Sequence, residues 1–181
     1  MTGYTSHHGT YLAHRLTLEG RDDDAFAKSL STARVETKPH QVDAALFALQ
    51  SPLSKGVILA DEVGLGKTIE ASMVIAQHWA ERRRRILLIV PASLRKQWQQ
   101  ELREKFSLSS TILDARTYRD AEKAGRLLPF DVNENIILVS YEFAARRADE
   151  IKRIAWDIVI LRVEAAIDQR TIARIGRFNI P

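Results

Sequence analysis

Residues 58–71, ILADEVGLGKTIEA, carry the side chains with the clearest chemical potential in this chain. Gly64 and Gly66 permit backbone turns that a Cβ would block, so that amide N–H groups can point at phosphate oxygens. Lys67 can reach the β- and γ-phosphates of a nucleotide, and the Thr68 hydroxyl can ligate Mg²⁺. A helix that begins near Lys67 would direct its free N–H groups at the same phosphates. The pattern predicts a site for a nucleoside triphosphate.

One position departs from the usual phosphate-binding loop, because Asp61 stands where the first glycine is expected. The alternative interpretation is a chance glycine-rich turn between a strand and a helix. The apolar residues 57–59 before the loop, and an apolar-faced helix after it, supply the structural context that the motif requires. We therefore favour the phosphate-binding interpretation.

The elements that must position this loop alternate between strands and helices. Helical periodicity is expected from Pro39 to Ser51 and over residues 68–83, 93–106 and 142–153, with a polar, partly helical connection at 117–134. Strands are expected at residues 56–60, 86–90, 111–113, 136–140 and 157–161. The alternation predicts an α/β fold, with a mainly parallel sheet and helices on both faces. Ligands of such folds gather at the carboxyl ends of the strands, where the loops at Asp61, Pro91 and Tyr141 would lie.

Composition limits the classes of function. The chain has 181 residues, enough for one α/β domain, and a net charge of +4 that permits an anionic partner. Without cysteine it can hold neither a disulfide nor a thiolate metal site. Its apolar runs fall far short of a membrane span, and its N-terminus has no apolar signal core. These observations favour a cytoplasmic protein that does not contact a membrane.

The chain divides into three parts. Residues 1–30 form a polar leader, in which His7 and His8 lack further ligands at metal-binding spacing and favour a solvated segment. Residues 31–161 carry the alternating elements and are expected to form the folded lobe. Residues 162–181 form a divergent basic tail, expected to be a helix or a frayed end.

Four segments occur in order at regular spacing: KPHQ, ILADEVGLGKTIEA, ILLIVPASLRKQWQQEL and ILVSYEFA. Over residues 38–161 the chain resembles the first RecA-like lobe of Swi/Snf-related ATPases in helicase superfamily 2, and is most similar to a bacterial branch of them. That family carries Asp-Glu where other phosphate-binding loops carry glycine, which accounts for Asp61. The resemblance implies a RecA-like fold and an ancestral activity of DNA-stimulated ATP hydrolysis that drives translocation on duplex DNA.

The resemblance also implies the residues of an ATP site. Gln41 would pair with the adenine edge, because an amide both donates and accepts; the alternative is a polar residue at a helix start. Glu62 would line the loop in a less defined role. The implied ATP-binding set is Gln41, Asp61, Glu62, Gly64, Leu65, Gly66, Lys67 and Thr68, with Thr68 holding Mg²⁺.

Two further segments match motifs that contact a nucleic-acid backbone. They supply Pro91, Ser93 and Lys96 after one strand, and Ser140 and Tyr141 after another. For the second pair a structural role is as well supported as a functional one. Trp98 lies on an apolar helical stripe and is expected in the core. The arginines at 82–85 should lie at the amino ends of the strands, away from the ligands, which argues against direct contact with nucleic acid.

The pattern breaks after the strand at 157–161. The family would supply Asp-Glu-Ala-His there, to hold Mg²⁺ and to polarise the attacking water, whereas this chain reads Arg162-Val163-Glu164-Ala165-Ala166. Glu164 matches the motif acid only after a one-residue slip, Asp157 stands at the wrong end of the strand, and Arg162 would repel a metal ion.

We also expect the second helicase lobe, with its arginine finger, to be missing from this chain. The expected function is ATP binding and weak binding to duplex DNA or another nucleic acid, with catalytic roles for Lys67, Thr68 and Glu164 but little turnover. A second helicase lobe or another protein would be the partner. A non-catalytic nucleotide- or nucleic-acid-binding module, and the remnant of a broken helicase gene, remain alternatives.

Overall fold

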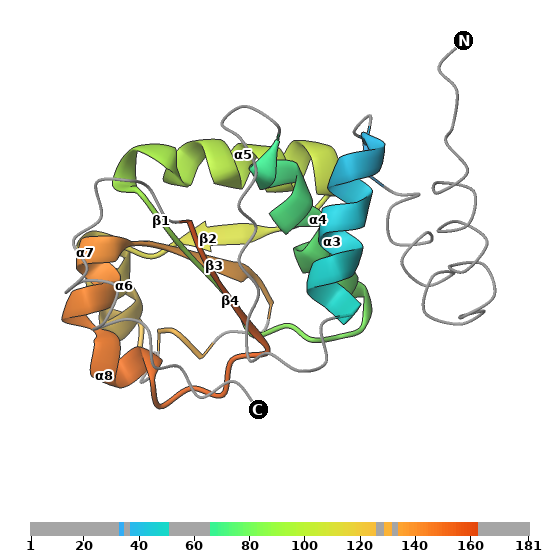
Figure 1. The fold of residues 1–181 in the computed structure, drawn as a ribbon. Helices are drawn as coiled ribbons and strands as arrows, with labels where there is room; N and C mark the ends of the chain where they lie inside the picture. The colour runs from blue at the N-terminus through green and yellow to red at the C-terminus, as the bar shows by residue number, and fades with distance from the viewer. Residues whose placement is uncertain (1–32, 35–36, 51–65, 126–128, 132–133, 163–181) are drawn as a thin grey trace, which may run out of the picture.

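A four-stranded parallel sheet forms the centre of the computed structural model, which describes residues 33–34, 37–50, 66–125, 129–131 and 134–162. The strands are β1 (Ile86–Val90), β2 (Ser110–Ile112), β3 (Ile136–Ser140) and β4 (Ile158–Leu161), in the spatial order β2-β3-β1-β4 (Figure 1). Every neighbouring pair is parallel, and Leu88 of β1 stands opposite Leu138 of β3 and Ile160 of β4. The predicted α/β fold with a mainly parallel sheet is confirmed.

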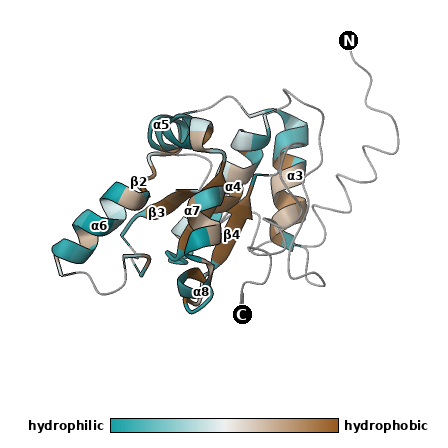
Figure 2. Cartoon of the chain, turned by 90° about the vertical axis from the view of Figure 1, so that its left-hand side faces the viewer, coloured by the Kyte–Doolittle hydropathy of each residue, from teal (hydrophilic) through white to brown (hydrophobic). Residues whose placement is uncertain are grey.

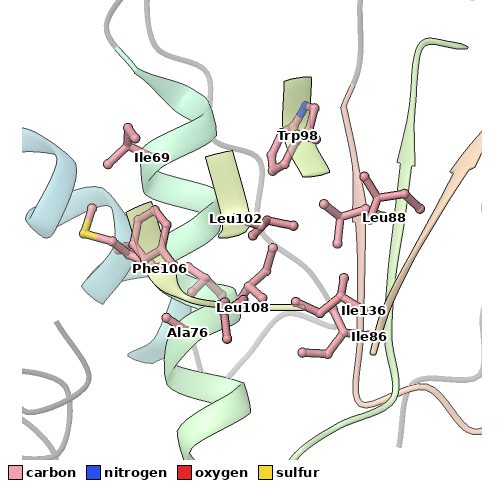
Figure 3. Close-up of a cluster of buried hydrophobic side chains, with 14 of the residues drawn as sticks. Ile69, Ala76, Ile86, Leu88, Trp98, Leu102, Phe106, Leu108 and Ile136 are labelled. Carbon is pink, nitrogen blue, oxygen red and sulfur yellow. The ribbon is translucent and has the colours of Figure 1, made fainter. Parts of the chain in front are cut away.

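One face of the sheet is covered by α3 (Pro39–Gln50), α4 (Lys67–Ala80) and α5 (Arg95–Phe106), with the 3₁₀ turn η1 (Ala92–Leu94) before α5 (Figure 1). Alternate strand residues such as Ile86 and Leu88 point to this face and pack against Leu102 (Figure 3). Trp98 is only 2% exposed and belongs to the same cluster, so its predicted core role is confirmed.

The other face is covered by α6 (Ala115–Lys123), α7 (Tyr141–Arg146) and α8 (Ala148–Ile151). The intervening strand residues, including Leu87 and Ile89, pack here against Phe130, Phe143 and Trp156. Figure 2 shows the apolar strands between helices with more polar surfaces. Because both faces are covered, all five residues of β1 are buried, as the uninterrupted apolar run predicts.

Three predicted helix boundaries differ from the structure. Helix α4 ends at Ala80 rather than near residue 83, because Arg82 adopts a left-handed conformation (φ 65°) and turns the chain toward β1. The helix expected from about residue 93 begins as the 3₁₀ turn at residues 92–94 and continues as α5 from Arg95. The single helix expected over 142–153 is two short helices, interrupted at Arg147 (φ −110°), whose guanidinium lies over the Tyr118 ring.

The predicted strand at 56–60, the leader at 1–30 and the tail from residue 163 lie outside the described residues. Among the helices that the structure does describe, none combines the length and the apolar character needed to cross a membrane.

Candidate functional site

The first turn of α4 carries the described part of the predicted phosphate loop. Gly66 is the N-cap of α4 with φ 92° and ψ 33°, a left-handed conformation that favours glycine, and its carbonyl accepts from Ile69 N at 2.7 Å. Lys67 and Thr68 follow as the first two helical residues, and both are half-buried. Unpaired N–H groups at a helix start create a region of positive potential. This turn can therefore receive an anion.

The position of α4 brings this turn to the expected edge of the sheet. Helix α4 ends at Ala80, five residues before β1 begins, so its C-terminus lies near the amino end of β1. With 14 residues the helix is about 21 Å long, and its N-terminus lies toward the carboxyl ends of the strands (Figure 1). Met73 and Ile75 are fully buried in the core cluster that also contains Ile86 and Leu88 of β1, which holds the helix in place.

Gln41 of α3 packs directly against the N-cap of α4. Its side chain is buried, and its Oε1 accepts a hydrogen bond from Lys38 N at 3.1 Å. A Cβ at Gly66 would collide with Gln41 Nε2. The structure thus brings together two predicted site residues that are 25 positions apart in the sequence. Asp61, Glu62, Gly64, Leu65 and Glu164 lie outside the described residues.

Arg162 occupies the position where the predicted acidic motif would begin. Its backbone N–H donates to Ile89 O at 3.0 Å and so extends the β4–β1 ladder by one residue. Asp157 lies at the opposite end of β4, where its carboxylate accepts a hydrogen bond from Arg85 N at 2.9 Å. The expectation that Asp157 stands at the wrong end to hold a metal agrees with this geometry.

The described residues do not form a divalent-metal site. Mg²⁺ binds through several oxygen ligands, usually including a carboxylate. Of the residues discussed above, Thr68 offers one neutral hydroxyl, while the position after β4 carries the cation Arg162. In the part of the chain that the structure describes, no group of three or more His, Cys, Asp or Glu side chains could hold a metal ion. Within the described residues, which exclude Asp61, Glu62 and Glu164, the donor set does not fit the metal that the sequence pattern leads one to expect.

The loop after β1 presents polar groups at the same edge of the sheet. Pro91 is half-buried and starts the turn, and its carbonyl accepts from Leu94 N at 3.0 Å. Ser93 and Lys96 are exposed near the start of α5. An exposed hydroxyl and an ammonium group beside a helix start can contact the phosphate groups of a nucleic-acid backbone.

The loop after β3 has a different character. Ser140 is buried, and its Oγ accepts from Phe143 N at 3.2 Å, which caps α7. Tyr141 is also buried, at 8% exposure. The exposed charge here belongs to Glu142, whose pKa is lowered first by a hydrogen bond from the Ser140 side chain and further by Arg146 and Arg95. The structure therefore gives Ser140 a capping role and presents a carboxylate beside it.

Asp114, at the start of α6, is a second carboxylate that the sequence analysis did not select. It accepts hydrogen bonds from Arg116 N at 2.9 Å and Thr117 N at 3.0 Å, while the Thr117 hydroxyl accepts from Asp114 N. The bond from Thr117 N lowers the pKa of Asp114, and Arg95 contributes as well. The Asp-x-x-Thr spacing of a capping box could have identified this residue from the sequence.

The arginines at 82–85 lie at the other edge of the sheet, and three of them have partners there. Arg83 lies 3.5 Å from Glu81, Arg84 stacks 4.2 Å from the centre of the Trp79 ring, and Arg85 pairs with Asp131 at 3.2 Å. These contacts support the expectation that the arginines at 82–85 stabilise the amino edge of the sheet and do not bind nucleic acid directly.

Comparisons with known proteins agree on one family. The model of the SNF2-related domain matches residues 34–170. The RNA polymerase-associated proteins RapA of Yersinia pestis (strain Pestoides F) and Serratia proteamaculans (strain 568) are each 37% identical over 132 residues, or 71% of this chain and 13% of the relative. The chain thus spans 13% of the length of these curated relatives.

A solved structure, the Sulfolobus solfataricus SWI2/SNF2 ATPase core in complex with dsDNA, matches with a TM-score of 0.59. The alignment covers 72% of this chain and 26% of that chain at 23% identity. At this identity the match supports the fold: a RecA-like lobe of the SNF2 type.

Proposed function

The chain belongs to the SNF2-related domain family, and from that premise we propose that it is an ATP-binding lobe of a Swi/Snf-type, DNA-dependent ATPase. The observation that carries the proposal is the arrangement at the start of α4. Gly66 holds the left-handed conformation of a phosphate loop, Lys67 and Thr68 follow it, and Gln41 packs against it. Two separately predicted features, the Gly-Lys-Thr segment and Gln41, thus lie side by side.

In this proposal Gly66, Lys67 and the first turn of α4 bind the phosphates, together with Asp61, Glu62, Gly64 and Leu65 of the preceding loop. Gln41 pairs with the adenine base. Its Oε1 already accepts from Lys38 N, but a carbonyl oxygen has two lone pairs and its Nε2 carries two protons, so base pairing is compatible with the present contact. The sequence-based expectation of Mg²⁺ rests on the Thr68 hydroxyl.

Turnover by this chain is proposed to be slow. Hydrolysis requires an oriented water and positive charge on the transferred phosphoryl group, in addition to Lys67 and Thr68. Arg162 stands where a carboxylate is expected, and Glu164 is a displaced candidate for the acid. Arg162 therefore favours a second candidate function, a binding module that holds nucleotide without efficient hydrolysis.

We further propose that duplex DNA or another nucleic acid lies across the loop after β1, contacting Pro91, Ser93 and Lys96. Ser140 and Tyr141 would support this surface from below, because both are buried. The similar solved structure is described as a complex with dsDNA, and the curated relatives as RNA polymerase-associated, which supports a nucleic-acid or protein partner, such as a second helicase lobe. A cytoplasmic location is part of the same proposal.

Thermal unfolding with and without ATP tests the nucleotide assignment. Ligand at 100 times its Kd stabilises a protein by about 2.7 kcal/mol, and each kcal/mol moves the Tm of a chain of this size by about 2–4 °C. Saturating ATP should therefore raise Tm by several degrees. Lys67→Ala should remove most of that shift, whereas Lys123→Ala, an exposed lysine on α6, should leave it intact. An equal shift in the Lys67 variant would disprove the assignment.

A further inference from the structure

The function proposed above gives Arg162 no contact with the nucleotide, yet the position of its backbone in the fold is well defined. The bond from Arg162 N to Ile89 O continues the parallel ladder beyond Leu161, which stands opposite Ile89. The guanidinium-bearing residue is therefore fixed at the carboxyl end of β4, in the strand next to β1. A cation is held at the edge where a metal-binding carboxylate was expected.

The alternation of β4 indicates the direction of this side chain. Ile158 and Ile160 pack into the cluster that contains α4, whereas Val159 and Leu161 pack into the cluster on the other face. Successive residues of an extended ladder point to opposite faces, so Arg162 shares the face of Ile158 and Ile160. That face also carries α4, whose Ile69 in the first turn belongs to the same cluster and whose N-terminus lies toward the carboxyl ends of the strands (Figure 1).

We propose that Arg162 binds the phosphates of the nucleoside triphosphate directly and supplies the positive charge that a divalent ion otherwise provides, so that binding does not require Mg²⁺. This inference rests on the proposed nucleotide site at Gly66, Lys67 and Thr68. It adds that this site accepts a nucleoside triphosphate without a bound metal ion. The misfit between the described residues and a metal site is then a consequence of the substitution at Arg162.

The chemistry of the guanidinium suits this role. Arginine stays protonated at any physiological pH, and its planar fork can donate two parallel hydrogen bonds to one phosphate group. Mg²⁺ withdraws charge from phosphate oxygens but needs oxygen ligands to hold it, whereas an arginine is held by the chain itself. Arg162 would add its charge to that of Lys67 and the helix start, and so offset part of the negative charge of a metal-free triphosphate.

The test is the Kd of ATP measured by calorimetry, once with excess Mg²⁺ and once with excess EDTA. For the unaltered chain the two values should agree within about threefold. Arg162→Gln should weaken binding in EDTA by at least about tenfold, which corresponds to 1.4 kcal/mol, and by less with Mg²⁺ present. Arg162→Lys keeps the charge but loses the planar fork. Its Kd for ATP in EDTA should therefore lie between those of the unaltered chain and of Arg162→Gln.

A matched control is Arg153→Gln, which removes the same charge from an exposed residue just before β4, at the amino edge, and should change neither Kd. Binding of the unaltered chain that falls more than tenfold in EDTA would overturn the inference, even if no variant folds. So would an Arg162→Gln chain, folded by its melting curve, that retains full affinity in EDTA. Absence of ATP binding in both buffers would instead refute the proposed nucleotide site itself.

Discussion

The two ends of the central sheet use their charged residues differently. At the carboxyl edge, Lys96 is exposed, Lys67 stands at a helix start, and Arg162 follows β4. At the amino edge, Arg83, Arg84 and Arg85 each contact an acid or an aromatic ring. The number of basic residues alone would favour the amino edge as the anion-binding site. Because Arg83, Arg84 and Arg85 already contact other side chains, the fold favours the carboxyl edge instead.

The difference follows from chain direction. Parallel strands place all their following loops at one edge, and the helices that follow also begin there, so unpaired N–H groups gather with the loop residues. The amino edge collects helix ends instead, where cations such as Arg82 and Arg83 are stabilised by the carbonyl ends of α4. Arg83, Arg84 and Arg85 at that edge therefore have a structural explanation in their contacts.

The largest expected effect is at Gly66. Gly66→Ala places a Cβ in a left-handed conformation, so backbone strain opposes folding, and the end of the buried Gln41 side chain must also shift. We expect a loss of about 2–4 kcal/mol in the free energy of unfolding, measured by urea denaturation, together with loss of ATP binding. The double variant Gly66→Ala with Gln41→Ala should recover part of the stability, because only the collision is removed. Full stability in the single variant would show that the α4 N-cap is not held as described.

An intermediate effect is expected at the amino edge. Asp157→Ala removes the acceptor of Arg85 N and leaves a partly buried N–H group without its partner, which should cost about 1–3 kcal/mol. Asp157→Asn keeps an oxygen acceptor and should lose less. In contrast to Gly66→Ala, the Kd of ATP should stay unchanged in both folded variants. A Kd that weakens with Asp157→Asn would show that the two edges are coupled.

The sequence predicted most of the sheet, because strands buried on both faces leave uninterrupted apolar runs such as those of β1 and β3. It could not predict the break at Arg147, whose guanidinium lies over the ring of the distant Tyr118, or the end of α4, since Arg82 there adopts a positive φ that arginine rarely takes. The same limit applies to the site. Glycine, lysine and threonine at fixed spacing identify the start of α4, but the burial of Ser140 and the lowered pKa of Glu142 emerge only from the fold.

The smallest expected effect distinguishes the edges directly. Lys96→Ala should weaken binding of duplex DNA a few-fold, equally for all sequences, and reduce the slope of log K against log salt by about 1, because one phosphate contact is lost. Few phosphates can be reached from this surface, so the slope of the unaltered chain should be shallow, about −2 to −4. Arg83→Ala removes the same charge from the amino edge, where Glu81 already neutralises it, and should leave both affinity and slope unchanged. Fluorescence anisotropy at several salt concentrations measures both quantities. If Arg83→Ala reduces the slope while Lys96→Ala does not, the nucleic acid binds the amino edge of the sheet and not the carboxyl edge.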